Sequence, residues 1–146
     1  MPEAVLHIGR HKSGTSSLQH FLGNRRDMLA AQGVLYPVAG GTNRVAHHRL
    51  ALAANPRQTP DPGGLAALAE EIRAEIRPHH ARLLFSSEAF QNIQDTARLR
   101  GFLDSLGIER VQVVCYVREH LDYAISAFRQ FVHNQPRFVT FAHYAR

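Results

Sequence analysis

The chain's single lysine lies in a short stretch rich in glycine, serine and threonine. Lys12 falls within residues 9–17, and the other 16 of the 17 Lys and Arg residues are arginine. An apolar run, residues 4–8, precedes this stretch, and a helical pattern follows it. A loop that opens into a helix offers backbone N–H groups and the positive end of the helix dipole to phosphate-like anions. Lysine adds a compact charge there, so the stretch indicates an anion-binding loop.

The spacing of this loop is close to a Walker A sequence but differs from it. Walker A reads G-x-x-x-x-G-K-[ST], with lysine directly after the second glycine. Gly9 and Gly14 have that spacing, but Thr15 follows Gly14 and Lys12 precedes it. The glycines and the helix start still predict a cradle, which the lysine reaches from another point. The alternative is an ordinary helix N-terminus capped by a Ser or Thr hydroxyl.

A second cation follows the most strongly predicted strand, residues 110–117. Arg118 stands at its end, and its bidentate fork suits a phosphate group. Ser126 comes eight residues later, about 80° around a helix from Arg118. Both side chains reach one ligand if the chain bends at the junction. In the alternative, Arg118 pairs with Glu119 or Asp122, and Ser126 has no role in binding.

Three residues are candidates for the base that removes a proton from an acceptor hydroxyl. Glu88 follows the predicted strand 81–86 within the sequence Ser86-Ser87-Glu88. His47 and His48 follow the glycine-rich loop, and histidine titrates near neutral pH. Adjacent helical residues point about 100° apart, so at most one of the two histidines is expected to face the site. Glu88 is the preferred candidate because of its place at a strand end. A structural or surface role is the alternative for each.

Apolar periodicity and Gly/Pro positions predict strands that alternate with helices, and hence an α/β fold with a mainly parallel sheet. The strand 110–117 is nearly continuously apolar, which predicts burial on both faces. Ligands bind at the carboxyl ends of such strands, so the three polar clusters are expected to converge. The expected elements are strands at 4–8, 34–37, 81–86 and 110–117, helices at 15–32, 45–54, 65–76, 95–106 and 119–133, and loops at 38–44 and 55–64.

Composition narrows the class of protein. A chain of 146 residues with 45% hydrophobic and 20% charged residues is expected to form one globular domain. The formal charge of +5 favours anionic ligands, but the arginines form no block, so nucleic-acid binding has no specific support. Cys115, the only cysteine, lies in an apolar run and is expected to be buried. Neither a signal peptide nor a membrane span is visible, which predicts a cytoplasmic protein. No Cys/His set has zinc spacing, so no metal is expected.

Two motifs resemble those of the sulfotransferases that use 3′-phosphoadenosine-5′-phosphosulfate (PAPS). The sequence Lys12-Ser13-Gly14-Thr15-Ser16 is similar to their 5′-phosphosulfate loop, Lys-[Ser/Thr]-Gly-Thr-[Thr/Ser]. Arg118 and Ser126 resemble their 3′-phosphate pair. The longer strings at 7–19 and 115–118 are most similar to bacterial members that act on carbohydrate-type hydroxyls. The resemblance implies a P-loop-like three-layer sandwich and PAPS as the sulfuryl donor, without a metal.

The resemblance also implies roles for individual residues. Lys12 is expected to stabilise charge at the bridging oxygen of the donor, and the acceptor is expected to be a hydroxyl of a carbohydrate or small molecule. The chain ends before the late basic, Gly-containing segment of the family, so residues 1–146 are expected to be the N-terminal part of a longer family domain. The expected donor-binding residues are Arg10, His11, Lys12, Ser13, Gly14, Thr15, Ser16, Ser17, Arg118 and Ser126.

Two other functions fit the same sequence. An ATP-dependent P-loop kinase needs Mg²⁺, usually held by a Ser or Thr and by an Asp after a strand. The predicted strand ends offer Ser86-Ser87-Glu88 and Arg118 but no Asp. A nucleotide-binding module without catalytic activity is the other alternative.

Overall fold

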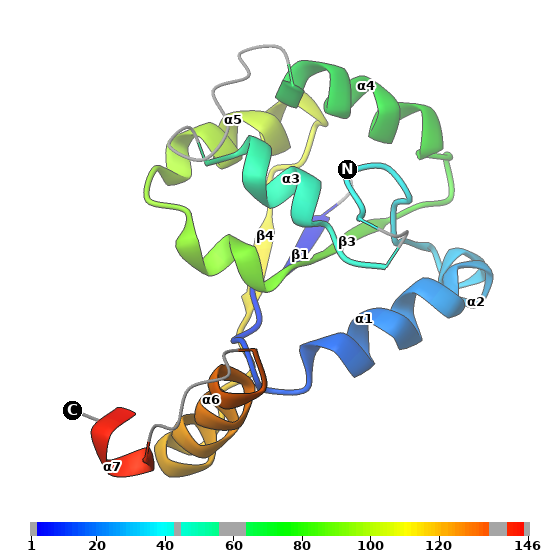
Figure 1. The fold of residues 1–146 in the computed structure, drawn as a ribbon. Coiled ribbons are helices and arrows are strands. Elements are labelled where there is room, and N and C mark those ends of the chain that lie inside the picture. The colour runs from blue at the N-terminus through cyan, green and yellow to red at the C-terminus, as the bar shows by residue number, and fades with distance from the viewer. Residues whose placement is uncertain (1–2, 43–44, 56–63, 135–139, 145–146) are drawn as a thin grey trace.

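The protein has an α/β fold in which a four-stranded, all-parallel sheet is flanked by helices (Figure 1). The structure is a computed structural model that describes residues 3–42, 45–55, 64–134 and 140–144; most of the loop expected at 55–64 lies outside these residues. The elements are β1 (Glu3–His7), α1 (Thr15–Asn24), α2 (Arg26–Ala31), β2 (Val34–Leu35), α3 (His48–Ala53), α4 (Gly64–Glu75), β3 (Arg82–Ser86), the 3₁₀ helix η1 (Glu88–Asn92), α5 (Thr96–Ser105), β4 (Val111–Val114), α6 (His120–Asn134) and α7 (Phe141–Tyr144).

The strands lie in the order β2-β3-β1-β4, with β1 between β3 and β4. His7 is in register with Ser86 of β3 and with Val114 of β4. The three strands therefore end at the same level. The segments that follow them start from one edge of the sheet, which is where a parallel sheet presents its ligand sites. The predicted parallel α/β fold is confirmed.

The main hydrophobic core lies on one face of the sheet. Alternate strand residues, Ala4 and Leu6 of β1 and Leu83 and Phe85 of β3, are at most 4% exposed. They pack with apolar residues of α3, α4 and α5, which lie together in the upper part of Figure 1. This packing follows from the period of two in a strand and gives the strand ends a rigid base.

The expectation that the strand at 110–117 is buried on both faces was wrong. β4 is shorter, Val111–Val114, and it forms an edge of the sheet. Val113 is 58% exposed, since no described element covers the side of β4 away from β1. Cys115 is also exposed, against expectation, and its Sγ donates to the Gly9 carbonyl oxygen over 2.9 Å.

Tertiary contacts move two helix boundaries away from the expected positions. The helix expected at 15–32 is divided into α1 and α2 at Arg25. There the Arg26 guanidinium donates to the carbonyl oxygens of Gly23 and Tyr36, which ties the chain to the residue after β2. The helix expected to start at residue 45 begins at His48.

Helices α6 and α7 extend away from the sheet, as Figure 1 shows. None of their described residues is buried. The short helix α7 lies beyond the last element expected from the sequence. Across the described ranges, no helix combines the length and the apolar character that crossing a membrane requires.

Candidate functional site

The loop between β1 and α1 follows a tight path through three residues with positive φ. Gly9 and Gly14 have φ values of 78° and 83°, and Lys12, which is not glycine, has a φ of 64°. The Ser13 hydroxyl donates to the Arg10 carbonyl oxygen over 2.5 Å and accepts the Arg10 N–H over 3.1 Å. Left-handed backbone at a lysine is uncommon and is often found at functional sites. The two bonds between Ser13 and Arg10 hold the loop together, so the Ser13 hydroxyl supports the loop's own structure.

Helix α1 begins with its N-terminal N–H groups uncapped by any side chain. Its capping residue is Gly14, which has no side chain to accept them. The Ser or Thr cap considered as an alternative is therefore absent at this helix. The helix start opens on a cavity of about 240 Å³. The residues that line this cavity, called here the loop cavity, are His11, Lys12, Gly14, Thr15, Ser16, Ser17, Glu88 and Gln130.

Gly9 allows the segment after β3 to approach the loop. A Cβ atom at position 9 would lie 2.7 Å from Glu88 Cβ and 2.9 Å from Glu88 Cα. No side chain fits at that distance, and the positive φ of Gly9 also favours glycine. The glycine therefore places Glu88 directly beside the β1–α1 loop, although the two residues are 79 positions apart in sequence.

Three side chains surround the Glu88 carboxylate. Gln19 Nε2 donates to its Oε2 over 2.9 Å. His48 Nε2 lies 3.8 Å, and His11 Nδ1 4.0 Å, from its Oε1. Burial raises the pKa of Glu88, but the Gln19 hydrogen bond, a backbone hydrogen bond and the two nearby imidazoles together hold the pKa below its usual value. Glu88 is therefore ionised at neutral pH.

The structure separates the two adjacent histidines. His48 forms a 2.7 Å hydrogen bond from Nδ1 to the Ser87 hydroxyl and lies beside Glu88. His47 is 1% exposed; its Nδ1 accepts the Ser86 N–H, and its Nε2 lies 3.0 Å from the Pro37 carbonyl oxygen. Burial lowers the pKa of His47 to about 4. We therefore withdraw His47 as a candidate base, because its ring is enclosed in the fold and both its nitrogens contact the backbone.

Arg118 contacts the loop, but Ser126 does not join it. Arg118 Nη1 donates to the Lys12 carbonyl oxygen over 3.2 Å. Its Nε lies 3.7 Å from Asp122 Oδ2, so the ion pair considered as an alternative is also present, although long and exposed. Ser126 lies on α6, and no hydrogen bond between described residues links it to Arg118. Arg10 lies over the Tyr123 ring, 5.3 Å from its centroid.

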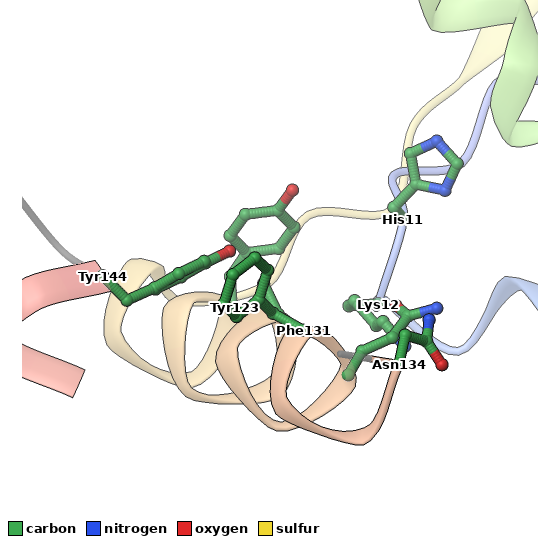
Figure 2. A pocket seen from close by; sticks show the side chains of 8 residues that line it. His11, Lys12, Tyr123, Phe131, Asn134 and Tyr144 are labelled. Carbon is green, nitrogen blue, oxygen red and sulfur yellow. The ribbon is translucent and has the colours of Figure 1, made fainter. Parts of the chain in front are cut away.

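A second cavity, of about 370 Å³, adjoins the first and is shown in Figure 2. His11, Lys12 and Gln130 line both cavities. We name the second cavity the aromatic cavity, after Tyr123, Phe131 and Tyr144, which line it with Ala127 and Asn134.

Two residues of these cavities and their surroundings, Gln19 and Gln130, were not predicted from the sequence. Gln19 has a detectable signal, because it shares a helical face with buried Thr15 and Leu22 and is the one amide on that face.

Comparison of the chain with protein-family models, with curated proteins and with solved structures found no match. The functional argument therefore depends on the two motifs and on the geometry of the site. Within the ranges that the structure describes, no group of three or more His, Cys, Asp or Glu side chains is arranged to hold a metal ion.

Proposed function

We propose that the protein is a sulfotransferase that moves a sulfuryl group from PAPS to an acceptor hydroxyl. The observation that carries the proposal is the loop cavity, where one lysine, the open end of α1 and an ionised carboxylate meet. The lysine and the open end of α1 bind a phosphosulfate group, and the carboxylate takes the proton of the acceptor hydroxyl. The motif resemblance supplies the identity of the donor.

The donor's 5′-phosphosulfate occupies the start of α1 in this proposal. The N–H groups of the first turn bind its oxygens, and the exposed hydroxyls of Ser16 and Ser17 add further donors. Arg118 binds the 3′-phosphate from its position beside the Lys12 carbonyl. Arg118 exchanges its long contact to Asp122 for the phosphate, because two phosphate oxygens accept two parallel N–H bonds from its guanidinium.

The transfer forms one S–O bond and breaks another. The acceptor oxygen attacks sulfur in line with the leaving phosphate, and its proton passes to Glu88. The electron pair of the broken S–O bond stays on the 5′-phosphate, which leaves as adenosine 3′,5′-bisphosphate. The Lys12 ammonium neutralises the charge that develops on this oxygen. His48 acts on the reaction through Glu88, which it contacts, since His48 does not line the loop cavity in the described residues.

Calorimetry and a turnover assay test the proposal together. We expect the protein to bind adenosine 3′,5′-bisphosphate without a metal and to release it from PAPS when an acceptor is present. Lys12→Ala is expected to lower turnover by about 10²–10³-fold, the scale for one preorganised charge donor, without a change in thermal stability. Full turnover by folded Lys12→Ala protein would refute the role given to Lys12.

One observation favours the kinase alternative and gives it a distinct test. Glu88 follows the strand next to β1 and shares the loop cavity with the helix start, a position from which a carboxylate reaches the Mg²⁺ of a bound nucleotide. Tighter binding of ATP–Mg²⁺ than of metal-free bisphosphate would decide for the kinase. Bisphosphate binding without turnover of PAPS would indicate a binding module.

A further inference from the structure

The aromatic cavity has the chemistry of a site for a hydroxylated ring. Its volume, about 370 Å³, falls in the range of small-ligand pockets. The rings of Tyr123, Phe131 and Tyr144 give it flat apolar surfaces, and the amides of Gln130 and Asn134 give it hydrogen-bond donors and acceptors. In Figure 2 the three rings lie over α6, and Asn134 lies next to Lys12.

Charge and polarity in the aromatic cavity select among possible ligands. Besides the two tyrosine hydroxyls, its charged or titratable lining groups are Lys12 and His11, and no carboxylate lines it. A pyranose ring places its C–H face on an aromatic ring while its hydroxyls bond to amides. A plain phenol fills the same volume but leaves the amides without partners, which costs free energy once they are enclosed.

The position of the aromatic cavity leaves it free for the acceptor. Under the proposed function the donor runs from the start of α1 to Arg118, and Arg118 does not line the aromatic cavity. Lys12, which the transfer step places at the breaking bond, lies at the junction of the two cavities. A hydroxyl bound in the aromatic cavity therefore reaches the loop cavity next to Lys12.

We propose that the aromatic cavity is the acceptor subsite and binds a pyranose unit of a carbohydrate. This inference rests on the proposed function for its place in the reaction. The sugar's ring stacks on the side chains of α6 and α7, its hydroxyls bond to Gln130 and Asn134, and one hydroxyl points towards Lys12.

The test measures oligosaccharide and nucleotide binding separately. Chitotetraose, maltotetraose and heparosan tetrasaccharide are titrated into the protein, with and without adenosine 3′,5′-bisphosphate. The variants are Asn134→Ala, which removes an amide, and Tyr123→Leu, which removes a ring but keeps apolar volume. His133→Ala is the control, since His133 is exposed on α6 and lines neither cavity in the described residues. Circular dichroism checks that each variant keeps its helices.

We expect at least one oligosaccharide to bind. Asn134→Ala and Tyr123→Leu should each weaken it by about tenfold, as for loss of one hydrogen-bonding or stacking partner. The bisphosphate affinity should stay within about twofold, and His133→Ala should change neither affinity. Oligosaccharide binding that depends on Asn134 in a protein that fails to bind the bisphosphate would support the carbohydrate subsite while the proposed function fails.

Three results would overturn the inference. The first is that none of the three oligosaccharides binds. The second is that Asn134→Ala weakens binding of the bisphosphate as much as binding of the oligosaccharide, which would mean that the aromatic cavity binds the donor's adenine. The third is that 2-naphthol binds more tightly than the oligosaccharides and that Asn134→Ala does not change its affinity, which would mean that the aromatic cavity binds a phenol instead of a sugar.

Discussion

Arg118 has two contacts that bear on its proposed role in binding the donor. Its guanidinium donates to the Lys12 carbonyl oxygen and lies near the Asp122 carboxylate. The first contact supports the loop, and the second holds the fork beside the start of α6. The proposed binding of a 3′-phosphate and the observed support of the loop can therefore be tested separately.

Arg118→Ala is expected to weaken adenosine 3′,5′-bisphosphate by about 1.5–3 kcal/mol, the value of a hydrogen bond to a charged group. Adenosine 5′-monophosphate, which lacks the 3′-phosphate, should lose much less affinity. Calorimetry with both nucleotides measures the difference. Equal losses for the two would mean that Arg118 acts through the loop alone. Arg129→Ala, an exposed change on α6, is the control and should alter neither affinity.

His47 links the stability of the fold to pH. Its pKa is lowered to about 4 by burial, against about 6.5 in an unfolded chain. Between these values the unfolded state binds the proton more readily, so stability is complete above about pH 6.5 and falls as the pH drops towards 4. The full effect is about 3 kcal/mol. His47→Gln should reduce this dependence, measured by urea unfolding at pH 4.5 and 7.

A control histidine separates this effect from general acid destabilisation. His79 is exposed, and His79→Gln should keep the pH dependence of the unmodified protein. If His47→Gln and the unmodified protein lose the same unfolding free energy between pH 7 and 4.5, burial of a neutral His47 is not the cause.

At the scale of elements, the β1–α1 loop and the segment after β3 form one unit. Gly9 lies against the Glu88 backbone, and Gln19 of α1 reaches the Glu88 carboxylate. The backbone after β4 joins the same unit, since Arg10 N–H donates to the Tyr116 carbonyl and Tyr116 N–H to the Gly9 carbonyl. Three strand ends are thus bonded to each other at the site.

Gly9→Ala is expected to destabilise the protein by about 2–4 kcal/mol. The added Cβ meets Glu88 at 2.7 Å, and alanine is strained at a φ of 78°. Gly101→Ala is the matched control: Gly101 lies within α5, and a Cβ there meets no atom within 4 Å. That change should stabilise the helix by about 0.5–1 kcal/mol. Equal stabilities for the two variants would contradict the close packing inferred at Gly9.

The elements that could be predicted from the sequence are those set by local pattern. Strand periodicity and the glycines of the first loop predicted β1, β3 and the start of α1. The division between α1 and α2 could not be predicted from periodicity, because the contact from Arg26 to Tyr36 causes it. The start of α3 depends in the same way on the contacts of His47 with Ser86 and Pro37.

The candidate site was predicted in its parts but not in its contacts. The position of Glu88 at a strand end predicted that it would lie near the loop, and it does. The choice between His47 and His48 required the fold, since only the tertiary structure shows which ring is enclosed. Tyr123 and Phe131 fall in the predicted helix 119–133 as ordinary apolar positions, and Tyr144 lies beyond it, so nothing in their spacing indicated a cavity.

At the scale of the whole molecule, the edge strand β4 exposes apolar surface. Val113 of β4 is 58% exposed, and among the described residues Val117, just after the strand, and Leu121, at the start of α6, are also exposed, at 78% and 57%. An apolar cavity of about 540 Å³ between β4 and α5 is lined in part by Val113. Exposed apolar surface on an edge strand promotes self-association.

Val113→Thr is expected to reduce self-association with little change in stability. The side chain already contacts water, so its replacement removes little buried area, and threonine keeps the strand propensity of valine. Light scattering measures association, and thermal unfolding measures stability. Leu83→Ala is the contrast: Leu83 is fully buried, and the change should cost about 2–5 kcal/mol. A large stability loss in Val113→Thr would show that the β4 edge is covered in solution.

Cys115 makes the site observable without any engineering of the chain. It is the one thiol in the sequence, it is exposed, and its sulfur contacts the carbonyl oxygen of Gly9, at the start of the β1–α1 loop. A maleimide fluorophore therefore attaches at a single point, within contact distance of the loop. If the proposed function holds, we expect its emission to change when a nucleotide binds.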